Sequence, residues 1–323
     1  MSLLRKLLFS LIASLLVLVL LEVGLRAAGY PPVAENPRFE HTQVYWVQDP
    51  DQKETEVAHR ETRGSFQVST DEHGLRTPIH GPVKPAGVKR VMTLGCSTTF
   101  GWGVDDAESY PARLEVHLKE KGYDNVEVIN GGQPGYTTFQ GLWLWEEVLK
   151  DYAPDVVIVG YVVQDAREVA YSDVSQALMQ ENAAFLKNNV LYQIQIYKAL
   201  RHALGRIQTQ AKDEQKNTFR VDEQNYLESL RTFRKKIEAV GAEPVYFGFP
   251  LERVGYTELH RNIMALAAKA DEVPHFDPSV EIEALTRSET LYFPQDRGHA
   301  NAAGCDTIGR MMADYLVDQG LVP

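Results

Sequence analysis

Hydrophobic residues follow two different patterns along this chain of 323 residues. Residues 7–21 form a single apolar run without a charge, whereas from Arg90 onward short apolar runs alternate with longer stretches of mixed polarity. Short, β-branched runs are typical of strands that are buried on both faces. They predict five strands, at 91–94, 126–129, 155–163, 244–249 and 275–277.

The stretches between these strands carry apolar residues every three or four positions, which is the spacing of one helix face. The sets are Tyr110, Leu114 and Leu118; Leu142, Trp145 and Leu149; Tyr226, Leu230, Phe233 and Ile237; Ile263, Leu266, Ala267 and Ala270; and Ile308, Met311, Met312, Tyr315 and Leu316. Strands that alternate with such helices form a parallel sheet covered on both faces. We therefore expect residues 90–323 to form a three-layer α/β/α domain with a five-stranded parallel sheet.

The uncharged run at the amino terminus has the composition of a membrane helix. Its 15 residues span only about 22 Å as a helix, and extending it to Leu25 gives about 28 Å and includes Glu22. A carboxylate near the end of a helix can lie at the headgroup level. Arg5 and Lys6 precede the run, which favours a cytoplasmic amino terminus and a body on the other side. We expect residues 1–29 to be one membrane-anchor helix.

A cleaved signal peptide and a buried helix of a soluble protein are the alternatives for this segment. Fifteen apolar residues also fit the central region of a signal peptide. The small residues expected before a cleavage site are poorly matched, because Leu25 or Arg26 takes the outer position when cleavage follows Ala27 or Ala28.

Two segments interrupt the regular alternation. Residues 30–89 are rich in proline, so we expect a linker and an amino-terminal extension with short strands at 42–47 and 65–69. Residues 166–220 form an insertion after the third strand, helical over 185–207. An insertion at the carboxyl end of a strand lies near the usual ligand crevice, so it can cap a site or be a surface excursion.

Charge and cysteine content narrow the function classes. The chain has 33 Lys and Arg against 44 Asp and Glu, a net charge of −11, which argues against nucleic acid as a partner. Two cysteines exclude a disulfide-built scaffold and a four-cysteine zinc site. A pairing of Cys96 with Cys305 stays open. His73, His80 and His275 show no ligand-like spacing, so we expect no metal and no cofactor.

Four polar segments follow predicted strands or precede the last helix. Ser97 follows the first strand, and a glycine-rich segment at 130–135 follows the second. Gln164 follows the third strand, and Asp296 and His299 lie just before the last helix. A serine at a strand-to-helix turn can act as a nucleophile, and an aspartate can orient a histidine that serves as general base. Taken singly, Ser97 is better explained as a helix cap and the Asp296–His299 segment as a surface turn, and Gln164 can equally cap the segment that follows it.

Together these segments resemble the SGNH hydrolases, also called GDSL-type esterases. The resemblance covers about 90–320 and includes TFGWGV after Ser97, EVINGGQPGYTT and APDVVIVGYVVQDA. It implies a flavodoxin-like fold, a catalytic set of Ser97, Asp296 and His299, and an oxyanion hole made by Ser97, Gly132 and Gln164. An anchor followed by TDEHGLR at 70–76 resembles extracytoplasmic, membrane-anchored members, several of which are linked to exopolysaccharide acetylation.

The chain departs from the family pattern at two positions. Cys96 stands where the family has an aspartate before the nucleophile. Gln164 stands where the family has an asparagine after the third strand. Gln164 carries the same amide on a side chain one methylene longer, and a misplacement of about 1 Å can change a rate about 100-fold. A thiol can also be a nucleophile, but we expect Cys96 to face the packed sheet.

The sequence thus predicts a serine-dependent acyl-ester hydrolase that acts on carbohydrate or small-molecule O-acyl or O-acetyl esters. We expect a single-pass protein of the bacterial inner membrane with its catalytic domain in the periplasm. Two alternatives stay open, a polysaccharide O-acetyltransferase that uses the same Ser97, His299 and Asp296, and a catalytically weak, membrane-anchored binding or scaffold subunit.

Overall fold

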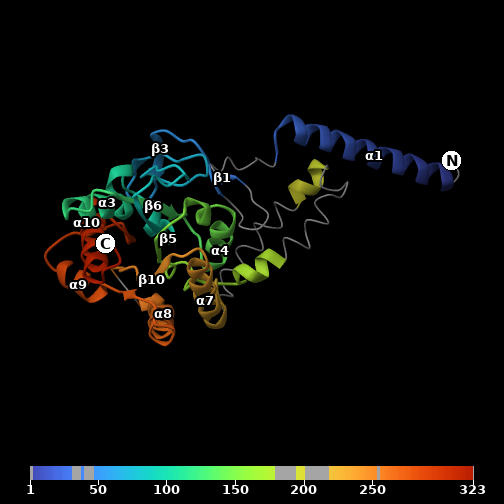
Figure 1. Cartoon of the computed structure of the whole chain (residues 1–323). Coiled ribbons are helices and arrows are strands. Elements are labelled where there is room, and N and C mark those ends of the chain that lie inside the picture. Colours follow the sequence, from blue (N-terminus) through green and yellow to red (C-terminus); the bar gives the residue numbers. More distant parts are fainter. Residues whose placement is uncertain are drawn as a thin grey trace. The chain divides into compact units, whose positions relative to one another are not determined.

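The computed structural model describes residues 3–30, 38–39, 47–178, 194–200, 218–252 and 255–322. The chain forms two compact units. One consists of 1–36 and 175–217, and the other of 37–174 and 218–323 (Figure 1). The extension expected at 30–89 therefore belongs, from Pro37 onward, to the same unit as the sheet.

The larger unit is built on a five-stranded parallel sheet in the order β11-β10-β7-β5-β6. The strands are β5 (Lys89–Gly95), β6 (Val126–Gly132), β7 (Val156–Val159), β10 (Glu243–Phe247) and β11 (His275–Phe276). Counted along the chain, their spatial order is 2-1-3-4-5, the flavodoxin-like arrangement. The predicted fold class is confirmed. β7 is shorter than the predicted 155–163, although the residues that follow it, up to Val163, remain buried.

Helices cover both faces of this sheet. One face packs against α4 (Thr138–Glu147), α7 (Glu223–Ala239) and α8 (Glu258–Asp271). The other packs against α3 (Tyr110–Glu120), α9 (Ser279–Leu285) and α10 (Ala302–Asp318). β7 is apolar at every position because both of its faces are buried. Val157 and Val159 pack in the core on the α4 side, and Val156 and Ile158 pack in the core on the α3 side.

The extension contributes a hairpin of β3 (Thr55–His59) and β4 (Gly64–Val68). β4 confirms the strand predicted at 65–69, whereas of the strand predicted at 42–47 only residue 47 is among the described residues. An isolated antiparallel bridge joins Arg76 to Asn130 on the edge strand β6. The extension is thus attached to the sheet beside the segment that carries the candidate glycines.

The hydrophobic patterns did not predict several short elements. These are β1 (Arg38–Phe39), β2 (Val47–Gln48), α2 (Ser97–Phe100), β8 (Glu168–Val169), β9 (Thr218–Phe219), β12 (Tyr292–Phe293) and β13 (Asp296–Ala300), with 3-10 turns at Asp106–Glu108, Leu149–Tyr152 and Gly255–Thr257. β12 and β13 form a hairpin. The segment from Asp296 to His299, expected as a turn, is therefore a strand, and Leu149 lies in a 3-10 turn after α4.

The smaller unit contains α1 (Leu3–Ala27). Residues 4–27 of this helix are long and apolar enough to cross a membrane, as both an anchor and a signal sequence would be. The carboxylate of Glu22 accepts the backbone N–H groups of Gln195 and Ile196, where a short helix at 195–200 begins. The rest of the helix predicted at 185–207 lies outside the described residues.

Candidate active site

Ser97 lies where β5 passes into α2, at the carboxyl end of the central strand. Cys96 is the residue before the helix, and Ser97 is its first residue, so the alternative in which Ser97 only caps a helix is wrong. The start of α2 lies directly against β6. A Cβ added at Gly132 would lie 2.3 Å from the Phe100 nitrogen, so only glycine allows this approach.

The three predicted catalytic side chains meet in one hydrogen-bonded series. Ser97 Oγ–H donates to His299 Nε2 over 2.8 Å, and His299 Nδ1–H donates to Asp296 Oδ2 over 2.6 Å. A carboxylate can only accept, so the proton of the neutral imidazole lies on Nδ1 and Nε2 is left to accept. This geometry is the one that a serine nucleophile, a general base and an orienting carboxylate require.

Asp296 is held ionised by its neighbours. Burial by itself raises the pKa of this carboxyl, but hydrogen bonds from His299 and His59 outweigh burial and lower the pKa to about 2. The side chain of Asp296 is 14% exposed and that of His299 is 22% exposed. Both side chains are therefore mostly covered, and a part of each reaches solvent.

The second imidazole on Asp296 belongs to the extension. His59 is the last residue of β3. Its Nε2 lies 3.2 Å from Asp296 Oδ2, and its Nδ1 lies 2.9 Å from Thr62 Oγ1. The sequence offered no signal for this contact, because 237 positions separate the two residues. His59, Glu61 and Asp296 present atoms within 4.8 Å of one another that could ligate a metal.

The glycine-rich segment supplies a different N–H group from the one predicted. Gly132 N–H donates to Asn130 Oδ1 over 3.0 Å inside the protein, so it is not available to an oxyanion, and this assignment does not fit the structure. Gln133, Pro134, Gly135 and Tyr136 form a turn closed by Tyr136 N–H and Gln133 O, with Gly135 at φ +81°. Among the described residues, Gly135 N–H has no hydrogen-bond partner. The Pro-Gly pair is the sequence signal for such a turn.

Gln164 is half-buried at the end of the segment that follows β7. Its Oε1 accepts a hydrogen bond of 3.1 Å from Arg220 Nη1. Within the described part of the chain, its Nε2 donates to no protein atom. The amide is thus held at its oxygen, and its N–H groups stay available.

The alternatives that involve cysteine do not fit the structure. Cys96 and Cys305 are both buried and free, so they form no disulfide here. Burial raises the pKa of the Cys96 thiol, and its side chain is part of the hydrophobic core beside α3 and α10. A neutral, packed thiol is a poor nucleophile.

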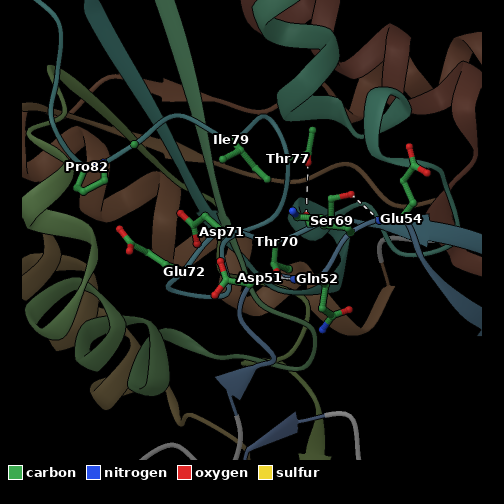
Figure 2. A pocket seen from close by; sticks show the side chains of 12 residues that line it. Asp51, Gln52, Glu54, Ser69, Thr70, Asp71, Glu72, Thr77, Ile79 and Pro82 are labelled. Atoms are coloured by element: carbon green, nitrogen blue, oxygen red, sulfur yellow. Dashed lines mark hydrogen bonds between the residues drawn. The ribbon is translucent and has the colours of Figure 1, made fainter.

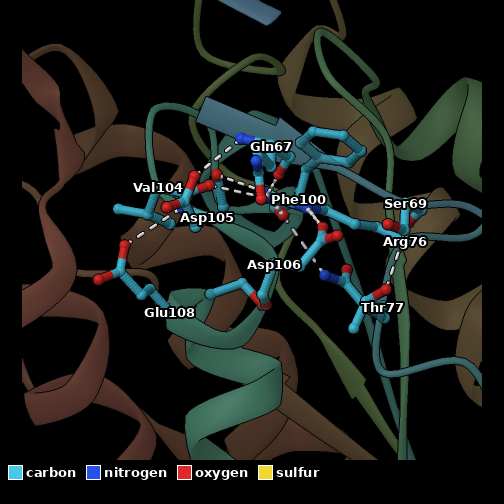
Figure 3. Close-up of polar contacts among 12 residues, drawn as sticks. Gln67, Ser69, Arg76, Thr77, Phe100, Val104, Asp105, Asp106 and Glu108 are labelled. Atoms are coloured by element: carbon cyan, nitrogen blue, oxygen red, sulfur yellow. Dashed lines mark hydrogen bonds and ion pairs between the residues drawn. The ribbon is translucent and has the colours of Figure 1, made fainter. Parts of the chain in front are cut away.

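The motif TDEHGLR ends in Arg76, a fully buried side chain that supports the turn after Ser97. Its guanidinium donates to the carbonyl oxygens of Phe100, Gly101 and Val104 over 2.6 to 2.8 Å. It also donates to the oxygen of Gln67 and pairs with Asp106 (Figure 3). The extension thereby holds the chain on both sides of the site, at Asp296 and after the nucleophile.

A hollow of about 830 Å³ lies elsewhere in the extension. Its walls include the carboxylates of Glu54, Asp71 and Glu72 (Figure 2). None of the predicted site residues lines this hollow, so it is separate from the Ser97 site.

Comparisons with known proteins agree with this geometry. A model of the GDSL-like lipase/acylhydrolase family matches residues 93–306. An arylesterase from Vibrio mimicus is 35% identical over 71 residues, which are 22% of this chain and 35% of the arylesterase. The chain thus matches only about a third of the length of that relative.

Solved structures show lower identity. A lipase/acylhydrolase from Enterococcus faecalis is 15% identical, with 72% of this chain and 97% of that chain covered at a TM-score of 0.49. An acetylxylan esterase from Geobacillus stearothermophilus is 14% identical, with 73% and 96% covered at 0.47.

The family model alone spans well over half of the chain. Its matched range begins in β5, includes Ser97 and Gln164, and extends beyond His299 into α10. This chain therefore belongs to the GDSL-like lipase/acylhydrolase family.

Proposed function

We propose that this protein is a serine esterase that hydrolyses O-acyl or O-acetyl esters of carbohydrates or small molecules. The observation that carries the proposal is the continuous series from Asp296 through His299 to Ser97, with both links between 2.6 and 2.8 Å. Family membership supports ester chemistry, and the similarity to an arylesterase supports small acyl esters as the first probes.

The first half of the reaction forms an acyl-enzyme. Ser97 Oγ attacks the ester carbonyl carbon while its proton moves to His299 Nε2, and Asp296 stabilises the resulting imidazolium. The tetrahedral intermediate then collapses, the bond to the alcohol oxygen breaks, and His299 gives its proton to the departing alcohol. The acyl group remains on Ser97 as an ester.

The second half returns the enzyme to its starting state. Water attacks the acyl-serine carbonyl while His299 Nε2 takes its proton. Collapse of the second intermediate breaks the bond to Ser97 Oγ, which receives that proton from His299, and releases a carboxylic acid. In both intermediates the negative oxygen needs donors aimed at it. We assign this role to the N–H groups of Ser97 and Gly135 and to the Gln164 amide, because each is free of other partners among the described residues.

The proposed place of action is the outer side of a bacterial inner membrane. Support comes from the apolar helix α1 and from Arg5 and Lys6 before its uncharged part. A sugar hydroxyl that replaced water in the second half would make the protein an O-acetyltransferase with the same residues.

The test is hydrolysis of p-nitrophenyl acetate by the full chain in detergent. We expect Ser97→Ala to lower kcat/KM by at least about 1,000-fold, while Ser288→Ala, an exposed serine outside the site, leaves it unchanged. Equal rates for wild type and Ser97→Ala would overturn the proposal and favour the scaffold alternative. Transfer of acetate to an added oligosaccharide in preference to water would favour the transferase.

A further inference from the structure

Arg220 lies directly beside the one oxyanion donor that departs from the family pattern. Its Nη1 donates to Gln164 Oε1 over 3.1 Å and to the Gly135 oxygen over 2.6 Å. Its other side pairs with both carboxylate oxygens of Asp173, over 2.9 and 2.7 Å. One guanidinium therefore contacts the two loops that carry Gly135 and Gln164.

The chemistry of these groups determines how the Gln164 amide is oriented. A guanidinium has only donors, so it can hold the amide by its oxygen and never by its nitrogen. With Oε1 fixed at Arg220, the Nε2 end points away from the arginine, and both of its N–H groups are free of protein partners in the described chain. An unheld glutamine has one more rotatable bond than asparagine and loses more freedom when it is ordered.

We propose that Arg220 is a positioning residue that fixes the Gln164 amide with its N–H groups toward the oxyanion. The proposal rests on the esterase function proposed above. It explains how the longer side chain serves at this position, because an anchored oxygen sets where the nitrogen lies. Arg220 itself touches no reacting atom.

Arg220 is itself held in place by several hydrogen bonds. Arg220 N–H donates to the Arg167 oxygen, and the Arg220 oxygen accepts from Asp173 N–H, beside the pairing of β8 with β9. Asp173 is 1% exposed, and its Oδ2 also accepts from Thr137 Oγ1. A bidentate, buried arginine–carboxylate pair has a fixed geometry that a lysine cannot reproduce.

A purely structural role of the Arg220–Asp173 ion pair and a positioning role of Arg220 predict different experimental results. If Arg220 only stabilised the fold, its replacement would lower the melting temperature and leave kcat per folded molecule unchanged. If it positions Gln164, its replacement lowers kcat, leaves KM nearly unchanged, and has no further effect once the amide is absent. The second pattern identifies residues that act as one unit.

The experiment measures kcat and KM for p-nitrophenyl acetate, together with melting temperatures, on the full chain in detergent. We expect Arg220→Lys and Gln164→Ala each to lower kcat roughly 10- to 100-fold, and the double variant to be no slower than Gln164→Ala. Arg287→Lys, at an exposed arginine outside the site, is the matched control and stays at the wild-type rate. Independent, multiplying effects of the two substitutions would overturn the proposal.

Gln164→Asn gives a second test that does not depend on Arg220 variants folding. It restores the shorter amide of the family pattern, but its oxygen no longer reaches Arg220. We expect kcat to fall, whereas an unchanged or higher kcat would overturn the proposal, because an amide that Arg220 does not hold would then serve as well. If wild type and Ser97→Ala were equally slow, the esterase function would fail instead, so the two failures are distinguishable.

Discussion

His59 Nε2 lies 3.2 Å from Asp296 Oδ2, the same oxygen that accepts from His299 Nδ1. One carboxylate therefore joins the imidazole of the extension to the imidazole of the base. His59 is 2% exposed, so this hydrogen bond is shielded from water. We therefore expect His59 to influence the proposed catalysis through the orientation of Asp296.

The first prediction concerns this contact. We expect His59→Ala to lower kcat roughly tenfold with KM nearly unchanged. A hydrogen bond to a charged group contributes about 1.5–3 kcal/mol, and without it Asp296 is held less firmly against the imidazolium that forms at the transition state. His59→Gln, which can still donate, should recover part of the rate. Steady-state kinetics with melting temperatures provide the measurement. A lower melting temperature with an unchanged kcat would limit His59 to a role in folding.

The second prediction concerns the buried guanidinium of Arg76. Arg76→Met removes the guanidinium donor from the oxygens of Phe100, Gly101 and Val104, and removing one partner of a buried network costs about 3–5 kcal/mol. We expect a melting temperature about 10 °C lower. Arg60→Met, at an exposed position of the same extension, is the control. Equal melting temperatures would contradict the supporting role assigned to Arg76.

The sheet was predictable because its strands are buried on both faces. The run at 156–159 is apolar at every position, and each residue enters one of two cores. The hairpin of β12 and β13 was not predictable, because His299 and Asp296 are polar and, among the described residues, their strand pairs with one short neighbouring strand. Short edge pairings lack the apolar pattern that identifies a central strand.

The sequence predicted the site residues that the family resemblance assigns. It did not predict the contacts that residues far away in the sequence make with them. Ser97, Asp296 and His299 are the positions that the resemblance to the family assigned, and the structure brings them together. Gly132 was misassigned, because sequence alone does not show that Asn130 already accepts its N–H. The contact of Arg220 with Gln164 joins residues 56 positions apart, across the insertion, and no local pattern signals it.

The third prediction concerns α1. If this helix is an uncleaved anchor, the full chain stays with the membrane after alkaline carbonate extraction, and its intact mass includes the segment before Tyr30. Leu16→Arg together with Val17→Arg should release it, since each arginine at a helix centre costs about 2.5–3.5 kcal/mol on insertion scales. Leu16→Ala with Val17→Ala is the control that stays bound. A mature amino terminus near Tyr30 would instead establish a cleaved signal peptide.

The fourth prediction concerns Asp165, which is fully buried after β7. Its Oδ1 accepts the N–H and hydroxyl of Thr138, and its Oδ2 has no partner in the described chain. Burial raises the pKa of this carboxyl to about 7 from 3.8, against the lowering effect of Thr138. The folded state therefore binds a proton that the unfolded state releases, and the resulting stability is full below about pH 4 and lost as pH rises through 7. We expect Asp165→Asn to match wild type in its free energy of unfolding at pH 4 and to exceed it by a few kcal/mol at pH 8. Urea denaturation at both values measures the difference, and a constant gap between the two proteins would show that Asp165 does not titrate in this range.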